Sequence, residues 1–155
     1  MVAVSTANVS SNRQVVLAWY DALRTGDTEA FQRVHHEDVI YDISGHSAIS
    51  GRHEGLRTLV ETILPVVFGG IDLAGFEFCK KVEIVAEDGA RLVGIMEVDG
   101  KATNGKRYDQ RYVHVFTVED RKVVRVMEFF DTELARDTVL AGAEDIPPKG
   151  PFQIR

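Results

Sequence analysis

Residues 106–131 read KRYDQRYVHVFTVEDRKVVRVMEFFD, and this stretch determines the predicted architecture. It contains two strand-like runs joined by a charged turn over residues 119–122. Alternate side chains of a strand share one face. One face of the first run combines aromatic and polar groups, from Tyr108, Gln110, Tyr112, His114, Phe116 and Val118. In the second run, Glu128 lies on an otherwise apolar face. The other members of that face are Val124, Val126 and Phe130. A carboxylate in such surroundings predicts that the stretch lines a small-molecule pocket.

Two helices are predicted near the start of the chain. Ser11 or Asn12 can cap a first helix, which continues to about Arg24 with an apolar stripe at helical spacing. Residues 25–27 then break this helix and start a shorter one over residues 28–34. Both helices precede any predicted strand.

Residues 37–44 alternate between apolar and polar side chains, which predicts the first strand. Residues 45–55 contain three glycines and are expected to form a loop that borders the pocket. Apolar residues return at helical spacing over residues 56–67, where Pro65 and two later glycines end a third helix.

The second half of the chain predicts an antiparallel meander. Residues 73–86 and 90–98 are strand-like and flank an Asp-Gly turn, and the two runs of residues 106–131 follow. Such short turns do not allow parallel crossovers. A last helical piece is expected over residues 133–140. The order α-α-β-α-β-β-β-β predicts an α+β fold in which helices cover one face of a curved antiparallel sheet, with a pocket between them.

At 155 residues, the chain is expected to form one domain over residues 12–141. Residues 1–11 are predicted to be a loose arm. Residues 142–155 form a proline-containing tail, predicted to be either disordered or draped over the domain or a neighbour.

Charge and composition exclude several classes of partner. The formal net charge of −6 argues against binding to nucleic acid or anionic lipid. The longest uncharged run, residues 62–71, is too short to span a membrane, and residues 1–11 lack the features of a signal peptide. A cytoplasmic location is therefore expected. Cys79 is the only cysteine, which excludes an intrachain disulfide.

No cofactor is expected. The glycines around His46 and His53 lack the Gly-Lys-Ser/Thr signature of a phosphate-binding loop. Two histidines in one loop are also too few for a metal site, which needs three or four converging ligands.

The order of elements, the loop SGHSAISGRHEG (residues 44–55) and the closing pattern KVVRVMEFFDT (residues 122–132) resemble the nuclear-transport-factor-2-like superfamily. They are most similar to its SnoaL-like branch, which groups with ketosteroid isomerases, polyketide cyclases and limonene epoxide hydrolases. The resemblance covers residues 12–140. It implies a conical half-barrel, packed on the three N-terminal helices, with a pocket open at one end, and a homodimer.

The resemblance also suggests roles for single residues. Ile43 stands where ketosteroid isomerases carry an aspartate base, with Asp42 on the opposite face. His114 occupies the position of the second acid of ketosteroid isomerases. Tyr112 and His114 occupy the positions of the Arg-x-Asp pair of limonene epoxide hydrolases. Glu128 matches the catalytic aspartate of these hydrolases. SnoaL-like cyclases place a histidine and an acid at positions that resemble His114 and Glu128.

Glu128 and His114 are the predicted catalytic residues. On neighbouring strands they can lie within hydrogen-bond reach and move a proton beside a carbonyl, or activate a water. The alternative is a polar seam in which the two bond each other, Arg111 or Arg125 without catalysis. The predicted substrate-binding residues are Trp19, Tyr20, Tyr41, Ile43, Tyr112, Phe116 and Phe130. Aromatic residues on a helix, such as Trp19 and Tyr20, are more often part of the core.

Two functions follow from these residues. The first is a cofactor-free isomerase, cyclase or hydrolase that acts on a hydrophobic carbonyl or epoxide compound. The second is a non-catalytic module that uses the same fold to bind a small apolar molecule or to dimerise. An interaction protein of the transport-factor type is a third reading, disfavoured by the charges on the outer sheet face at Arg111, Glu119 and Arg125.

Overall fold

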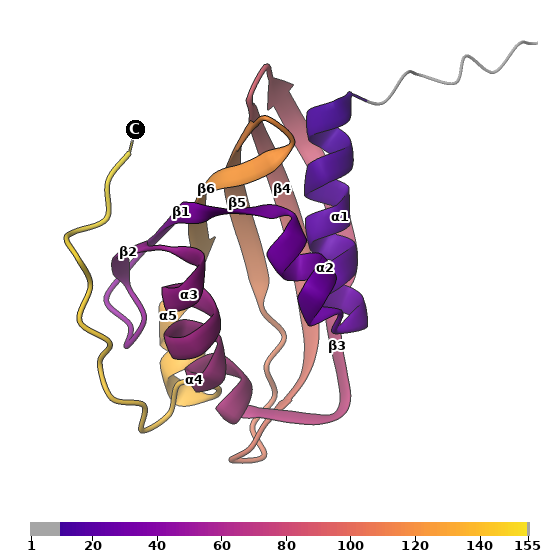
Figure 1. Cartoon of the computed structure of the whole chain (residues 1–155). Coiled ribbons are helices and arrows are strands. Elements are labelled where there is room, and N and C mark those ends of the chain that lie inside the picture. Colours follow the sequence, from indigo (N-terminus) through magenta and orange to yellow (C-terminus); the bar gives the residue numbers. More distant parts are fainter. Residues whose placement is uncertain (1–9, 155) are drawn as a thin grey trace, which may run out of the picture.

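The computed structural model describes residues 10–154 (Figure 1). Helix α1 (Ser11–Thr25) is capped by Ser10, whose hydroxyl accepts a hydrogen bond from the backbone N–H of Arg13, so the cap lies just before the predicted one. Gly26 ends the helix in the left-handed conformation. The predicted arm lies outside the described residues except for Ser10, which caps α1, and Ser11, which begins it.

Helix α2 (Thr28–Arg33) leads into strand β1 (His35–Ile43), which starts two residues earlier than the alternation of apolar residues predicts. Strand β2 (Gly51–Glu54) lies inside the predicted loop, so this part of the prediction is wrong. The sequence GRHE has no apolar alternation; the strand forms because its backbone pairs with β1 on one side and with residue Gly150 of the tail on the other.

The predicted third helix is one continuous rod with three parts. These are α3 (Leu56–Thr58), the π-helical turn η1 (Leu59–Ile63) and α4 (Leu64–Gly69). Pro65 lies in the first turn of α4. A proline lacks the backbone N–H and collides with the carbonyl four residues earlier, and a wider π turn before it avoids both problems.

The sheet has six strands in the order β2-β1-β6-β5-β4-β3. The last four are β3 (Ile71–Asp88), β4 (Arg91–Ala102), β5 (Arg111–Glu119) and β6 (Lys122–Phe130). They form the predicted meander, and only β1 and β6 run parallel. The sheet is curved and open, and the helices lie on one side of it (Figure 1). The α+β prediction is therefore confirmed, with β2 as an additional strand.

One irregularity in β6 changes which residues face the helices. Thr117 pairs with Arg125 and Val118 with Val123, so Val124 is an extra residue in a bulge. Val123 and Val126 are both fully buried, whereas Val124 is only half-buried. The predicted inclusion of Val124 in the inner face is therefore wrong, although Glu128 and Phe130 keep their predicted side.

Helix α5 (Thr132–Asp137) follows β6, with Asp131 as its cap. The tail then returns along β2, where the backbone of Arg52 exchanges hydrogen bonds of 2.8 and 2.9 Å with Lys149 and Gly150. None of the helices within residues 10–154 combines the length and the apolar character needed to cross a membrane.

Candidate functional site

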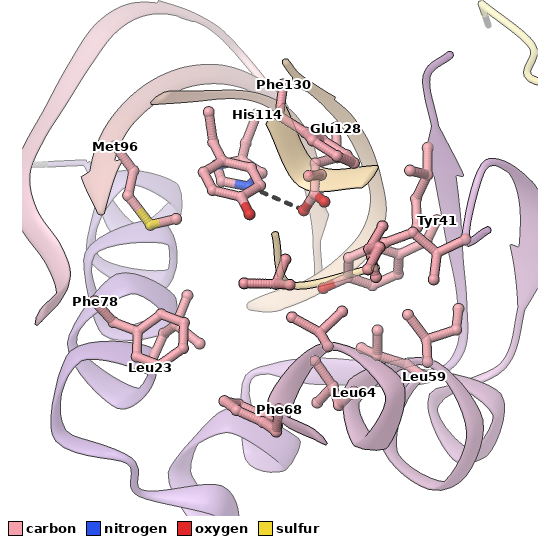
Figure 2. Close-up of a pocket in the computed structure, with 18 of the residues that line it drawn as sticks. Leu23, Tyr41, Leu59, Leu64, Phe68, Phe78, Met96, His114, Glu128 and Phe130 are labelled. Atoms are coloured by element: carbon pink, nitrogen blue, oxygen red, sulfur yellow. Dashed lines mark hydrogen bonds and ion pairs between the residues drawn. The ribbon is translucent and has the colours of Figure 1, made fainter. Parts of the chain in front are cut away.

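A cavity of about 80 Å³ lies between the curved sheet and the helices (Figure 2). Its walls come from α1, α2, β1, the α3–α4 rod, all of the strands β3 to β6, and the end of the domain. Most of the lining is aliphatic or aromatic. The polar groups on it are Tyr41, Tyr108, Tyr112, His114 and Glu128, together with the indole of Trp19.

His114 and Glu128 face each other across the β5–β6 ladder, where they are directly paired. Their Nε2 and Oε2 atoms are 3.1 Å apart, drawn as the dashed line in Figure 2. The side chain of His114 is 1% exposed and that of Glu128 is 16% exposed. Among the described residues, no group bonds the other carboxylate oxygen, Oε1. Glu128 thus has one oxygen held by His114 and one available within the cavity lining.

Tyr20 bonds the far side of the His114 ring. Its hydroxyl lies 2.9 Å from Nδ1 of His114. The contact exists because Gly94 is paired with His114 in the β4–β5 ladder and leaves a gap above β4. A Cβ atom at Gly94 would lie 2.8 Å from Cε2 and 2.9 Å from Cζ of Tyr20. A glycine at this point lets α1 reach the buried histidine.

These contacts fix the proton positions on His114. Burial raises the pKa of Tyr20 well above its ordinary value, so the phenol keeps its proton and can donate to Nδ1. A neutral ring with its proton on Nδ1 would instead place two acceptors, Nε2 and the Glu128 carboxylate, against each other. The imidazole therefore carries a proton on Nε2, which it donates to Glu128. The result is a Tyr20–His114–Glu128 relay.

A second polar cluster lies at Tyr41. The Tyr41 hydroxyl is 2.7 Å from Nε2 of His35 and 3.3 Å from Nε1 of Trp19. The other ring nitrogen of His35 is 2.6 Å from the carbonyl of Phe31. Burial lowers the pKa of His35 to about 4, so the ring is neutral and donates to Phe31. Tyr41 therefore donates to Nε2 of His35, and the indole N–H of Trp19 is shared between that nitrogen, at 3.1 Å, and the Tyr41 hydroxyl.

Tyr108 and Tyr112 form a third polar group, with their hydroxyls in direct hydrogen-bond contact. The ring of Tyr112 is stacked on that of His114, with centroids 5.7 Å apart and planes 3° from parallel. Burial raises the pKa of Tyr108 to about 12 and that of Tyr112 well above its ordinary value. Both phenols are protonated. One proton joins the two oxygens, and the side chain of Gln110 makes a further hydrogen bond to Tyr108.

The structure brings most of the predicted site residues to one cavity. Those on its lining are His114, Glu128, Trp19, Tyr41, Ile43, Tyr112 and Phe130. Tyr20 and Phe116 do not line it. Phe116 packs behind His114 and Trp19, and Tyr20 bonds His114 from that same layer. Tyr20 is thus placed to act through His114 and not by contact with a ligand.

Two residues of these clusters were not among the predicted site residues. For His35, nothing in the local sequence pattern shows that its side chain points toward Tyr41. Tyr108 shares the parity of Tyr112 and His114, which is a usable signal. It precedes the start of β5, however, so parity alone does not establish which way its side chain points.

Asp42 lies on the opposite face of β1 from the cavity. Its buried carboxylate accepts hydrogen bonds from Arg52, Arg125 and the backbone N–H of Gln153, at 2.9–3.1 Å. Ile43, which lines the cavity, is paired with Glu128 across β1 and β6. Arg125 forms an ion pair with Asp42, and Arg111 forms one with Glu97. The alternative hypothesis had instead allowed these arginines to contact His114 and Glu128.

The histidines of the glycine-containing loop do not converge. His53 is buried and lies 2.8 Å from the carbonyl of Ile49, whereas His46 is exposed. Across residues 10–154, no three histidine, cysteine, aspartate or glutamate side chains are grouped as a metal ion would require.

Similarity to known proteins agrees with this architecture. Residues 16–126 match the SnoaL-like domain family. An NTF2-like protein of unknown function from Burkholderia pseudomallei K96243 is 23% identical, with a TM-score of 0.72 over 85% of this chain and 99% of that one. A candidate polyketide cyclase from Xanthomonas campestris pv. campestris is 22% identical, with a TM-score of 0.69 over 86% and 99%. The comparison with curated proteins gave no significant match.

TerC, crystallised with polyporic acid, is a further similar structure. It is 23% identical, with a TM-score of 0.70 over 84% of this chain and 98% of TerC. At such identities the likeness shows the fold, and one fold hosts many reactions. The family match covers most of the domain, and the strand order and helix positions agree with it. The chain belongs to the SnoaL-like domain family, and it shares its fold with the NTF2-like protein described above.

Proposed function

We propose that this protein is an acid/base enzyme acting on a small hydrophobic compound that carries a carbonyl group. The observation that carries the proposal is the arrangement of Glu128: Oε2 is bonded to His114, while Oε1 is unbonded on the lining of an apolar cavity. A carboxylate in a mostly dry site can accept a proton from carbon and return it.

In the proposed reaction, Glu128 removes a proton from the carbon beside the carbonyl. The C–H electron pair moves into the new C–C double bond, and the carbonyl oxygen becomes an enolate. The hydroxyls of Tyr108 and Tyr112, which line the same cavity, are the proposed hydrogen-bond donors to that oxygen. If the substrate has a β,γ double bond, the enolate is a dienolate, and return of the proton at its γ carbon completes an isomerisation. Attack of the enolate carbon on a second carbonyl of the same molecule forms a ring, with the proton delivered to the new alkoxide.

His114 acts on Glu128 as a hydrogen-bond donor. Its Nε2 proton stabilises the carboxylate, and Tyr20 holds the ring in the tautomer that allows this. The polyketide cyclase assignment of a similar structure supports the cyclisation branch of the proposal. Neither branch changes the oxidation state of the substrate.

The test is exchange of carbon-bound hydrogen in deuterium oxide, followed by proton NMR, with 2-tetralone as an apolar ketone probe. We expect the wild-type protein to accelerate loss of the protons beside the carbonyl. Glu128→Gln should reduce the rate by about 10²–10⁴-fold, the usual contribution of a general base. Glu133→Gln, a carboxylate change outside the cavity lining, is the matched control. An exchange rate in Glu128→Gln equal to wild type would exclude Glu128 as the base.

A binding module without catalysis is the second candidate. It is favoured by the Tyr41 cluster, whose hydrogen bonds are already made within the protein. In that case 2-tetralone would bind to wild type and Glu128→Gln alike, and neither would exchange its protons above the uncatalysed rate.

A further inference from the structure

An apolar groove of about 260 Å³ lies next to the cavity, between the end of α1, helix α2, the α3–α4 rod and the start of β3. Five side chains line both spaces, namely Leu23, Phe31, Leu64, Phe68 and Phe78. These five side chains therefore form a wall that the cavity and the groove share.

The partition consists largely of aromatic rings. Phe68 and Phe78 meet edge to face with centroids 5.6 Å apart, and Phe76 packs on Phe78 at 4.6 Å. Phe68 is partly exposed to solvent. Figure 2 shows Leu23, Phe68 and Phe78 on the side of the cavity away from His114 and Glu128. Rotation of an exposed ring is a fast side-chain motion that leaves the backbone in place.

The cavity by itself is small. Ligand pockets usually measure about 300–1,000 Å³, whereas the inner cavity has about 80 Å³. The polar groups that would act on a ligand line only this inner space. The groove is lined by Leu73, Phe76 and the shared apolar residues, with polar side chains at one margin. Those margin residues are Arg24, Thr25, Asp27, Thr28 and Gln32, which carry one charge of each sign.

We propose that the groove is a subsite for an uncharged alkyl or aryl extension of the substrate, with Phe68 and Phe78 as the gate between the two spaces. This inference rests on the proposed function for the inner cavity and adds the substrate class: an elongated molecule with one polar, reactive end. The polar end lies beside Glu128 and the apolar extension passes between the two phenylalanines. Leu73 contacts only the extension.

The test uses 4-alkylphenols from 4-ethylphenol to 4-hexylphenol. Trp19 is the only tryptophan, and it lines the cavity but not the groove, so its fluorescence reports entry of the phenol end. We expect affinity for wild type to rise by about fourfold per added methylene, the effect of burying each one. Leu73→Glu should remove most of this gain while leaving the affinity for 4-ethylphenol unchanged.

Val85→Glu is the matched control. Val85 lies on the same strand as Leu73 and is also exposed, at 47% compared with 70% for Leu73, but it lines neither the cavity nor the groove. It should keep the full dependence on chain length. Binding that is independent of chain length in wild type would overturn the subsite but leave the proposed reaction intact. Absence of any Trp19 response would contradict both. If Leu73→Glu instead altered the sedimentation of the ligand-free protein, the groove would be a contact between copies, which also overturns the subsite.

Discussion

His35 gives the molecule a pH-dependent stability. Burial lowers its pKa to about 4 in the folded protein, against about 6.5 in an unfolded chain. Between these values the unfolded chain binds a proton that the folded protein excludes, so the free energy of unfolding falls as the pH decreases. From pH 7 to pH 4.5 the expected loss is about 2–3 kcal/mol. Urea denaturation of wild type and His35→Gln at both pH values measures it.

The His35→Gln variant should lose most of this dependence, because glutamine does not titrate. His46→Gln, at an exposed histidine, should keep it. Identical pH dependence in wild type and His35→Gln would show that another buried group is responsible.

Single residues also show the reach of sequence-based prediction. Strand parity was sufficient to pair His114 with Glu128, because both lie on the inner face of neighbouring antiparallel strands. It was not sufficient for Tyr20, which was predicted to bind substrate and instead bonds His114. That contact depends on how α1 lies across β4. The apolar periodicity of a helix or of a strand predicts which of its faces is buried, but not how closely two elements far apart in the sequence approach each other.

At the scale of elements, the contact between α1 and β4 depends on Gly94. We expect Gly94→Ala to reduce the free energy of unfolding by about 1–3 kcal/mol, the usual effect of overpacking, because the added methyl meets the Tyr20 ring. It should also slow 2-tetralone exchange, since the displaced phenol no longer fixes the His114 tautomer. Thermal or urea unfolding and the exchange assay measure the two effects.

Tyr20→Phe provides the comparison for Gly94→Ala. It removes the hydrogen bond to His114 without adding volume, so it should slow exchange and shift its pH profile. Normal exchange in both variants would show that the Tyr20 hydroxyl has no part in the reaction.

The elements themselves were predicted to different degrees. The meander was readable because β3 to β6 alternate and are joined by short turns. Strand β2 was not, because GRHE has no apolar alternation, and the strand is defined by backbone pairing with β1 and, at Arg52, with Gly150 of the tail. The bulge at Val124 also could not be predicted. Val123 and Val124 are both valines, and only the pairing of β6 with β5 decides which of the two is buried.

At the scale of the whole molecule, the outer face of the sheet carries two apolar rows. The ladders align Ile95 with Val113 and Phe129, and Val93 with Val115 and Met127. Ile95 and Phe129 are exposed. We expect this face to join two copies into a homodimer, and Ile95→Glu to shift the sedimentation coefficient to that of a monomer. Leu17→Glu, at an exposed leucine on α1, should have no such effect. A monomeric wild type at micromolar concentration would contradict the expectation.

The tail that runs along β2 is expected to reduce aggregation of the protein through the edge of its sheet. An edge strand offers unpaired backbone groups to other chains and promotes aggregation. Here the tail occupies that edge through Lys149 and Gly150, and its prolines, at 147, 148 and 151, have no N–H with which a further strand could pair. A chain that ends at residue 145 should scatter light increasingly with time while the full chain stays clear. The last ten residues would then act as a barrier that keeps the sheet finite.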